Sequence, residues 1–357
     1  METELNGAPV RFAALGGTVF CVDDALDVRG RDADGTWWYQ LHPGDPLEGP
    51  DQNSYGYRAT LAECTEENHS APLYAYRWIY RCLMEHFGAP ERTLFCDGTV
   101  ARYTGLQAAD NGGGVLYIPF AQFHGLALAD ALILLQRVIV DHHLIALHVM
   151  NAAPNGALMV RFAASAEELT AMESVLAGTL ALIDGKIGDL YGFTPSSPPA
   201  TAEDRVKVAK VIFDWLHLNN AYAATDSWLN GTVYAALSRG DQAPVCSSYA
   251  RAAHLLLDRY GIENIVCSGK RNAGDSEDHE WNLVNYHDTV GSYTAAAAQW
   301  CIFDATGTPS GTLTNWDDFN CISQEGRHVD STTLYPLPVT HPLDGEHTYT
   351  GSETYGW

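Results

Sequence analysis

The chain of 357 residues is 46% hydrophobic and 18% charged, which excludes a disordered polypeptide and allows one large domain or two. Its 44 acidic and 20 basic residues give a net charge of -24, and a surface this negative disfavours binding to nucleic acid or to anionic membranes. No apolar run approaches the roughly 20 residues that cross a bilayer, and the N-terminus is acidic where a signal peptide would be basic, so we expect no membrane span.

The N-terminal part of the chain, residues 1–195, predicts a partly helical region. Residues 1–60 are rich in Gly, Asp and Pro and favour short strands and loops. Apolar residues at helical spacing predict helices over residues 73–87 and 126–140. A third helix follows the capping-box pattern that starts at Ser165. We expect a mostly helical accessory region that shapes the substrate cleft.

A proline-rich stretch separates this region from the rest of the chain. Three prolines and several small polar residues in the segment 193–201 prevent a helix from continuing through it. We therefore place a boundary near residue 195 and expect a second domain over 196–357, with its core at about 200–330.

The second part predicts two helices followed by strands. Thr201 and Asp204 can cap a helix that runs to about Asn219, and a second helix is predicted from Cys246 to Tyr260. The hydrophobic period then changes to that of short β-prone runs, at 264–268, 281–286 and 300–304. A helix followed by an antiparallel sheet is an α+β pattern.

Three residues in this part have the chemistry of an acyl-transfer site. Cys246 lies at a predicted helix N-terminus, where free N–H groups and the helix dipole stabilise a thiolate. His279 lies at the start of one predicted strand, and Asp304 lies at the end of the next. A thiol, an imidazole that takes its proton and a carboxylate that orients the imidazole are the parts such a site requires.

Each of these residues is a weak signal alone, but their order and local sequences resemble the transglutaminase-like superfamily of cysteine enzymes, in its prokaryotic branch. The matching segments are Val245-Cys246-Ser-Ser-Tyr249-Ala250, His279-Glu-Trp281-Asn282-Leu-Val284 and Asp304-Ala-Thr306. The resemblance implies a papain-like core in which the helix that carries the nucleophile packs on an antiparallel sheet. The family commonly has Gly, Ala and Tyr where this chain has Ser248, Glu280 and Cys301.

The resemblance also implies roles for individual residues. Cys246 would be the nucleophile, His279 the general base and later the acid, and Asp304 the orienting carboxylate. The Cys246 N–H would bind the oxyanion together with a second donor, for which Tyr234 is a candidate, although a core role for Tyr234 is equally compatible with its aromatic ring. Trp281 is a further candidate for contact with the oxyanion or the substrate.

We expect acyl transfer on peptide bonds or on Gln or Asn amides, and hydrolysis by a protease or amidase is favoured because the resemblance points to peptidase-like relatives. Protein cross-linking by a transglutaminase is the first alternative, since the same triad serves both outcomes. A catalytically silent cell-surface binding module is the second. The expected partner is a protein or peptide substrate, no cofactor is implied, and the family suggests an extracellular or cell-surface setting.

The remaining cysteines and a histidine cluster carry secondary expectations. The eight cysteines include no C-x-x-C pair, so neither a zinc ribbon nor a thioredoxin-type motif is indicated. We expect Cys267 and Cys301 to be buried and reduced, with one or two disulfides elsewhere if the protein is exported. Asp141-His142-His143 with His148 suggests a metal site, but the spacing does not place His143 and His148 on one helical face, so packing or surface roles are favoured.

Overall fold

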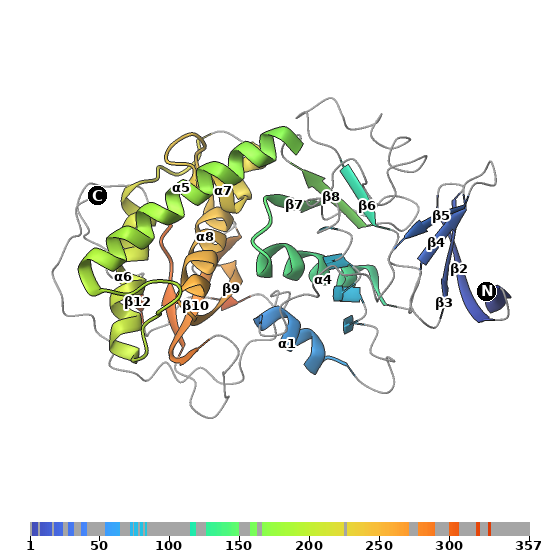
Figure 1. Ribbon diagram of the computed structural model, residues 1–357, viewed down its shortest axis with the longest axis horizontal. Coiled ribbons are helices and arrows are strands. Elements are labelled where there is room, and N and C mark those ends of the chain that lie inside the picture. Colours follow the sequence, from blue (N-terminus) through green and yellow to red (C-terminus); the bar gives the residue numbers. More distant parts are fainter. Residues whose placement is uncertain are drawn as a thin grey trace. The chain divides into compact units, whose positions relative to one another are not determined.

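A computed structural model shows an α+β protein whose chain divides into two compact units (Figure 1). The first unit comprises Met1–Asp51, Tyr57–Ile139 and Ala146–Ala166. The second unit comprises Gln52–Gly56, Val140–Ile145 and Glu167–Trp357. The structure describes residues 2–5, 8–15, 18–23, 28–31, 37–40, 54–64, 72–73, 75–77, 79–80, 83, 115–118, 126–149, 158–162, 166–224, 227–270, 278–289, 300–306, 319–321 and 328–329.

The first unit contains two antiparallel sheets. In the first sheet each strand pairs with the next one along the chain, in the order β1 (Glu2–Leu5), β2 (Ala8–Leu15), β3 (Thr18–Asp23), β4 (Val28–Arg31) and β5 (Trp37–Gln40). The second sheet has the order β6 (Val115–Ile118), β8 (Leu158–Phe162) and β7 (Ala146–Val149). Short strands were predicted at the N-terminus, whereas β6, β7 and β8 were not, because apolar runs of four or five residues show no distinctive period.

Helices accompany these sheets. The predicted helix 126–140 is confirmed as α4 (Leu128–Asp141), and a shorter helix, α1 (Tyr55–Ala62), precedes it in the chain. The second half of the predicted helix 73–87 lies outside the described residues, and those described within 72–83 are helical. Arg137 of α4 donates two hydrogen bonds to the carboxylate of Glu63, at 2.6 and 2.8 Å, just beyond the end of α1. The described part of the chain before residue 195 thus mixes strands and helices, and the expectation of a mostly helical region is corrected.

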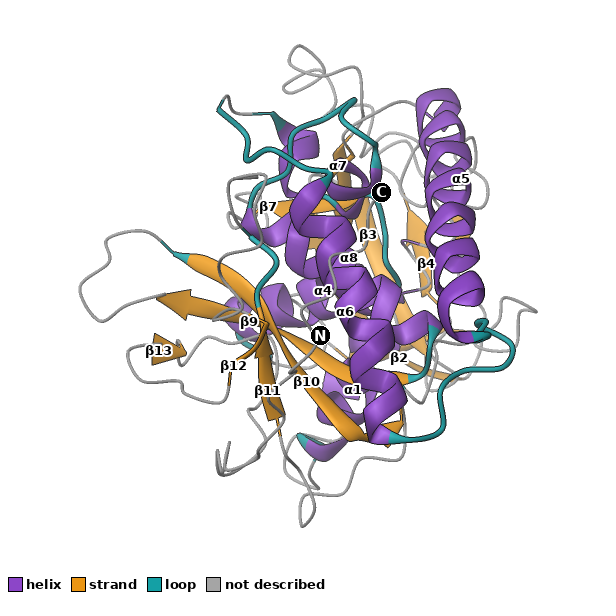
Figure 2. Ribbon diagram, turned by 90° about the vertical axis from the view of Figure 1, so that its left-hand side faces the viewer, coloured by secondary structure: helices purple, strands orange, loops and turns teal. Residues whose placement is uncertain are grey.

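The second unit consists of helices and one antiparallel sheet. Its helices are α5 (Ala166–Tyr191), α6 (Ala202–Leu218), the 3-10 turn η3 (Trp228–Gly231), α7 (Val233–Leu237) and α8 (Cys246–Arg259). The sheet has the order β12 (Phe319–Cys321), β11 (Trp300–Phe303), β10 (His279–Thr289), β9 (Ile262–Lys270) and β13 (His328–Val329). Helix α8 packs against β9 and β10, and α6 contacts β10 (Figure 2).

Helices α6 and α8 of the second unit begin and end close to where the sequence predicts. The Thr201 side chain accepts a hydrogen bond from the Asp204 N–H at 3.2 Å and so caps α6, whose predicted inward residues, among them Ile212 and Trp215, are buried. Helix α8 ends before Gly261, which adopts a φ of 63° that glycine accepts without strain. The predicted strands are also confirmed, as β9, β10 and β11.

Helix α5 belongs to the second unit and is held there by polar contacts. The Asp184 carboxylate pairs with Arg259 and accepts a hydrogen bond from the Tyr260 hydroxyl at 3.0 Å. The Thr179 hydroxyl donates to the Leu237 carbonyl at 2.8 Å. The proline-rich segment 193–201, where the sequence suggested a boundary, therefore connects two helices within the same unit.

The core of the second unit is aromatic and includes two thiols. Trp215, Trp281 and Trp300 are among its largest fully buried side chains. Both Cys267 and Cys301 are buried, as predicted. Among the described residues, no helix has both the length and the apolarity needed to cross a bilayer.

Candidate active site

Cys246 is the first residue of α8, and backbone contacts fix the segment that leads into it. Val245 precedes the helix in an extended conformation, with φ of -107° and ψ of 176°. Its N–H donates to the Asn230 carbonyl at 2.9 Å, and the Pro244 carbonyl accepts from the Ala223 N–H at 2.9 Å. The chain therefore enters α8 along one fixed path, which sets the position of the half-buried Cys246 thiol.

The N-terminal turn of α8 leaves its first donors available. Val245 provides no side-chain cap, and its carbonyl accepts from Ser248 and Tyr249 at 2.9 and 3.2 Å. Within the described part of the chain, no acceptor bonds to the N–H of Cys246 or Ser247. Such free N–H groups at a helix start stabilise nearby negative charge, on a thiolate or on an oxyanion.

His279 and Asp304 lie together at the ends of neighbouring strands. The His279 Nε2 atom is 2.8 Å from the Asp304 Oδ2 atom. Asp304 is 2% exposed, and its second oxygen accepts from the Thr306 N–H at 3.1 Å, which fixes the carboxylate plane. The Cys246 side chain lies close enough to His279 to raise the pKa of the imidazole. Because Nε2 faces Asp304, Nδ1 is the ring nitrogen left for the thiol, so the structure brings the three predicted residues together.

The electrostatics of this arrangement favour a protonated imidazole. Burial disfavours the charged ring and by itself lowers the pKa of His279. The hydrogen bonds to Asp304 and Cys246, with the negative charges of both groups, outweigh burial and raise the pKa to about 9. At neutral pH the site therefore favours imidazolium, and an imidazolium stabilises a neighbouring thiolate.

Trp281 lies against the imidazole. Its ring stacks on that of His279, with 5.9 Å between centroids and 19° between planes. Trp281 is only 1% exposed, so it presents almost no surface to a substrate. Its contact fits a positioning role for the His279 ring better than the substrate or oxyanion contact suggested by the sequence.

Tyr234, the candidate oxyanion donor, has its hydroxyl group engaged elsewhere. The hydroxyl donates to the Asp241 carboxylate at 2.9 Å, and the residue is 3% exposed. Burial, and then the bond to Asp241, raise the pKa of Tyr234 to about 12. An oxyanion role would require the bond to Asp241 to break, so the packing role that the sequence also allowed fits the structure better.

Two residues that sequence analysis did not assign to the site hold its parts in place. Asn282 donates from its buried amide to the Ala250 carbonyl at 2.9 Å, which ties β10 to the second turn of α8. Ser248 donates to the Thr232 carbonyl and accepts from the Ala236 N–H at 2.9 Å, which ties α8 to α7. The signal for Asn282 was its place in the His279 motif. The signal for Ser248 was a hydroxyl where the family commonly has Gly.

Helix α6 supports the carboxylate side of the site. Phe213 packs edge-on against Phe303, the residue before Asp304, with 5.3 Å between ring centroids.

On the imidazole side of the site, burial raises the pKa of Glu280, although the positive charges of Arg251 and His279 act in the opposite direction. Glu280 therefore carries its negative charge less readily than an exposed glutamate.

Among the described residues, the triad is not a group whose ligand atoms lie close enough together to hold one metal ion. Neither the protein-family models nor the curated protein sequences with which the chain was compared match it. The functional argument therefore depends on the site itself.

Proposed function

We propose that this protein is a transglutaminase-like cysteine enzyme with a papain-like core, and that it transfers acyl groups from peptide bonds or from Gln or Asn amides. One observation carries the proposal: the His279 imidazole hydrogen-bonds the buried Asp304 carboxylate and interacts with the Cys246 side chain at a helix start. This is the connectivity that a nucleophile, a base and an orienting group require.

The chemistry follows from these positions. The Cys246 thiolate attacks the substrate carbonyl, and the Cys246 N–H faces the oxyanion that forms. His279 then gives its proton to the leaving amine or ammonia, which produces a thioester and a neutral imidazole. The neutral imidazole removes a proton from water or from an acceptor amine, and the incoming nucleophile releases the acyl group from Cys246. Asp304 keeps the ring oriented and stabilises each imidazolium state.

Hydrolysis is the favoured outcome, and it differs from cross-linking only in the nucleophile that resolves the thioester. An assay with a protein substrate and a fluorescent primary amine separates the two. Hydrolysis releases peptide fragments or ammonia, whereas cross-linking incorporates the amine into protein. The Cys246→Ala variant should do neither, because no other group replaces a thiolate that is both nucleophilic and a good leaving group.

Thiol labelling tests the proposal without a known substrate and separates it from a silent binding module. At pH 7, Cys246 should react with iodoacetamide at least about tenfold faster than an ordinary protein thiol. Cys64 is the internal control, because it is also half-buried and its Sγ atom donates a hydrogen bond to the Thr60 carbonyl, at 3.4 Å. Peptide mapping by mass spectrometry gives both rates. Equal labelling rates for Cys246 and Cys64 would contradict the proposal that Cys246 is an activated nucleophile.

A further inference from the structure

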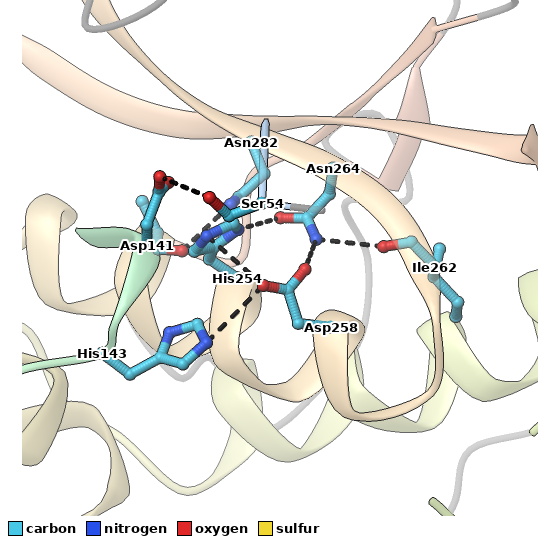
Figure 3. Close-up of polar contacts among 9 residues, drawn as sticks. Ser54, Asp141, His143, His254, Asp258, Ile262, Asn264 and Asn282 are labelled. Carbon is cyan, nitrogen blue, oxygen red and sulfur yellow. Dashed lines mark hydrogen bonds and ion pairs between the residues drawn. The ribbon is translucent and has the colours of Figure 1, made fainter. Parts of the chain in front are cut away.

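A second cluster of potentially reactive side chains lies at the opposite end of α8 from Cys246. His143 comes from the turn that follows α4, and His254 and Asp258 lie one turn apart on α8 (Figure 3). All three residues belong to the second unit. His254 comes eight residues after Cys246, which is about 12 Å along a helix axis. The cluster is therefore separate from the candidate active site.

The cluster has the dimensions of a metal site. The Nε2 atoms of His143 and His254 each lie 3.5 Å from the Asp258 Oδ2 atom. One ligand atom from each residue lies within 4.8 Å of the other two. A tetrahedral ion with bonds of about 2.0 Å separates its ligand atoms by about 3.3 Å, so only small side-chain movements would complete the coordination.

A hydrogen-bond chain orients the ring of His254 toward the cluster. The Asn264 amide group donates to the Asp258 Oδ1 atom at 2.8 Å and to the Ile262 carbonyl at 3.1 Å. Its oxygen therefore has to accept from the His254 Nδ1 atom, at 2.7 Å. In the neutral ring, this bond places the proton on Nδ1 and leaves the lone pair on Nε2. A ring N–H held by an oxygen acceptor is the usual arrangement behind a metal-binding histidine.

The Nε2 atom of His254 makes no hydrogen bond in the described structure. His254 is 3% exposed, and Nε2 is buried without a hydrogen-bond partner. The atom points into the space that it shares with Asp258 and His143 (Figure 3). A buried acceptor without a donor is costly, and a bound cation would remove that cost.

The backbone conformation at His143 turns its ring toward the cluster. His143 adopts a φ of 53°, in the left-handed region that residues other than glycine seldom occupy. This conformation brings its ring to 5.1 Å from that of His254, between centroids. The side chains of His143 and Asp258 remain 22% and 25% exposed, which leaves a path for an ion and for a water as fourth ligand.

We propose that His143, His254 and Asp258 bind a divalent ion of the zinc class, which fastens the turn after α4 to helix α8. Two imidazoles and one carboxylate suit Zn²⁺ and its transition-metal neighbours, whereas Ca²⁺ and Mg²⁺ prefer sites made of oxygen ligands. The site has a structural role, since it lies about two helical turns from Cys246. The sequence drew attention to His143, but with His142 and His148 as its partners.

The test measures zinc binding in a variant that lacks the Cys246 thiol, so that this thiol cannot bind the ion. Metal-free Cys246→Ala protein, kept reduced, should bind one Zn²⁺ per chain by calorimetry. Co²⁺ in the same protein should give the intense visible bands of a four-coordinate ion. Saturating Zn²⁺, at about one hundred times the dissociation constant, should raise the melting temperature by roughly 5–10 °C.

Two substitutions and one control decide the assignment. His143→Gly removes a ligand at a position where glycine relieves the backbone, so the metal-free variant should melt no lower than its parent. Asp258→Asn removes the charged ligand and keeps the side-chain shape. Each should weaken Zn²⁺ binding at least tenfold and lose the thermal shift, whereas His142→Ala, one residue away, should retain both. Parent-like binding by the first two variants, or no binding by the parent, would overturn the proposal.

Discussion

At the residue scale, a single imidazole carries the charge balance of the candidate site. His279 is 12% exposed in its side chain and contacts Cys246, Asp304 and Trp281. Burial alone would make it a neutral ring, and its two hydrogen bonds reverse that preference. The protonation of His279 therefore depends on the negative charge of Asp304 more than on the shape of the Asp304 side chain.

The Asp304→Asn variant tests that dependence. The substituted amide would keep an oxygen for the Thr306 N–H, but it removes the charge that raises the pKa of His279. The pKa should therefore fall from about 9 toward the ordinary value of 6.5, and the alkaline limb of the activity profile should move to lower pH. The maximal rate should also fall, but less than in Cys246→Ala. An alkaline limb that stays in place would show that Asp304 does not set the charge of the ring.

At the element scale, α8 and β10 hold the nucleophile and the base, and one amide joins them. The Asn282 bond to the Ala250 carbonyl is buried and links residues 32 positions apart in sequence. Antiparallel pairing of Asn282 with Phe303 continues the connection to β11 and Asp304. Contacts between elements thus set the relative positions of Cys246, His279 and Asp304. No single helix or strand fixes these positions by itself.

Replacement of Asn282 by Ala should affect both stability and reactivity. The loss of a buried hydrogen bond should lower the free energy of unfolding by about 1–3 kcal/mol, and a looser contact between β10 and α8 should slow iodoacetamide labelling of Cys246. Urea unfolding and peptide mapping measure the two effects.

Asn220→Ala is the matched control for this variant, because Asn220 is also buried and donates to the Leu216 and Ala236 carbonyls. It should lose similar stability with little change in labelling. If both variants labelled at the wild-type rate, Asn282 would have no positioning role.

At the scale of the whole molecule, the same imidazole links folding to pH. Its pKa is about 9 in the folded protein and near 6.5 in an unfolded chain, so the folded state binds its proton more tightly. The resulting stabilisation is complete below about pH 6.5 and is lost as the pH rises through 9. The difference between the two values corresponds to a free energy on the order of 3 kcal/mol.

Comparison of the wild type with His279→Gln should reveal this linkage. The wild-type free energy of unfolding should decline between about pH 6.5 and 9 by an amount that the variant does not show. Denaturant unfolding at several pH values gives the two curves. Parallel curves would mean that the proton on His279 does not contribute to folding stability.

The sequence by itself determined the local features of this protein. Sequence patterns predict the cap at Thr201, the end of α8 at Gly261 and the short β-prone runs that form β9 to β11, because these features depend on residues close in the chain. Sequence patterns did not predict strands β6, β7 and β8, because their apolar runs are too short to show a period.

Only the tertiary structure decided which distant residues meet. Sheet register and helix packing bring His279 to Asp304, and they turn Tyr234 toward Asp241 rather than toward the triad. The same packing places His143 beside His254 and Asp258, whereas the sequence grouped it with Asp141, His142 and His148. The physical reason is that contacts of high sequence separation depend on how whole elements dock, and no local pattern of residues encodes that docking.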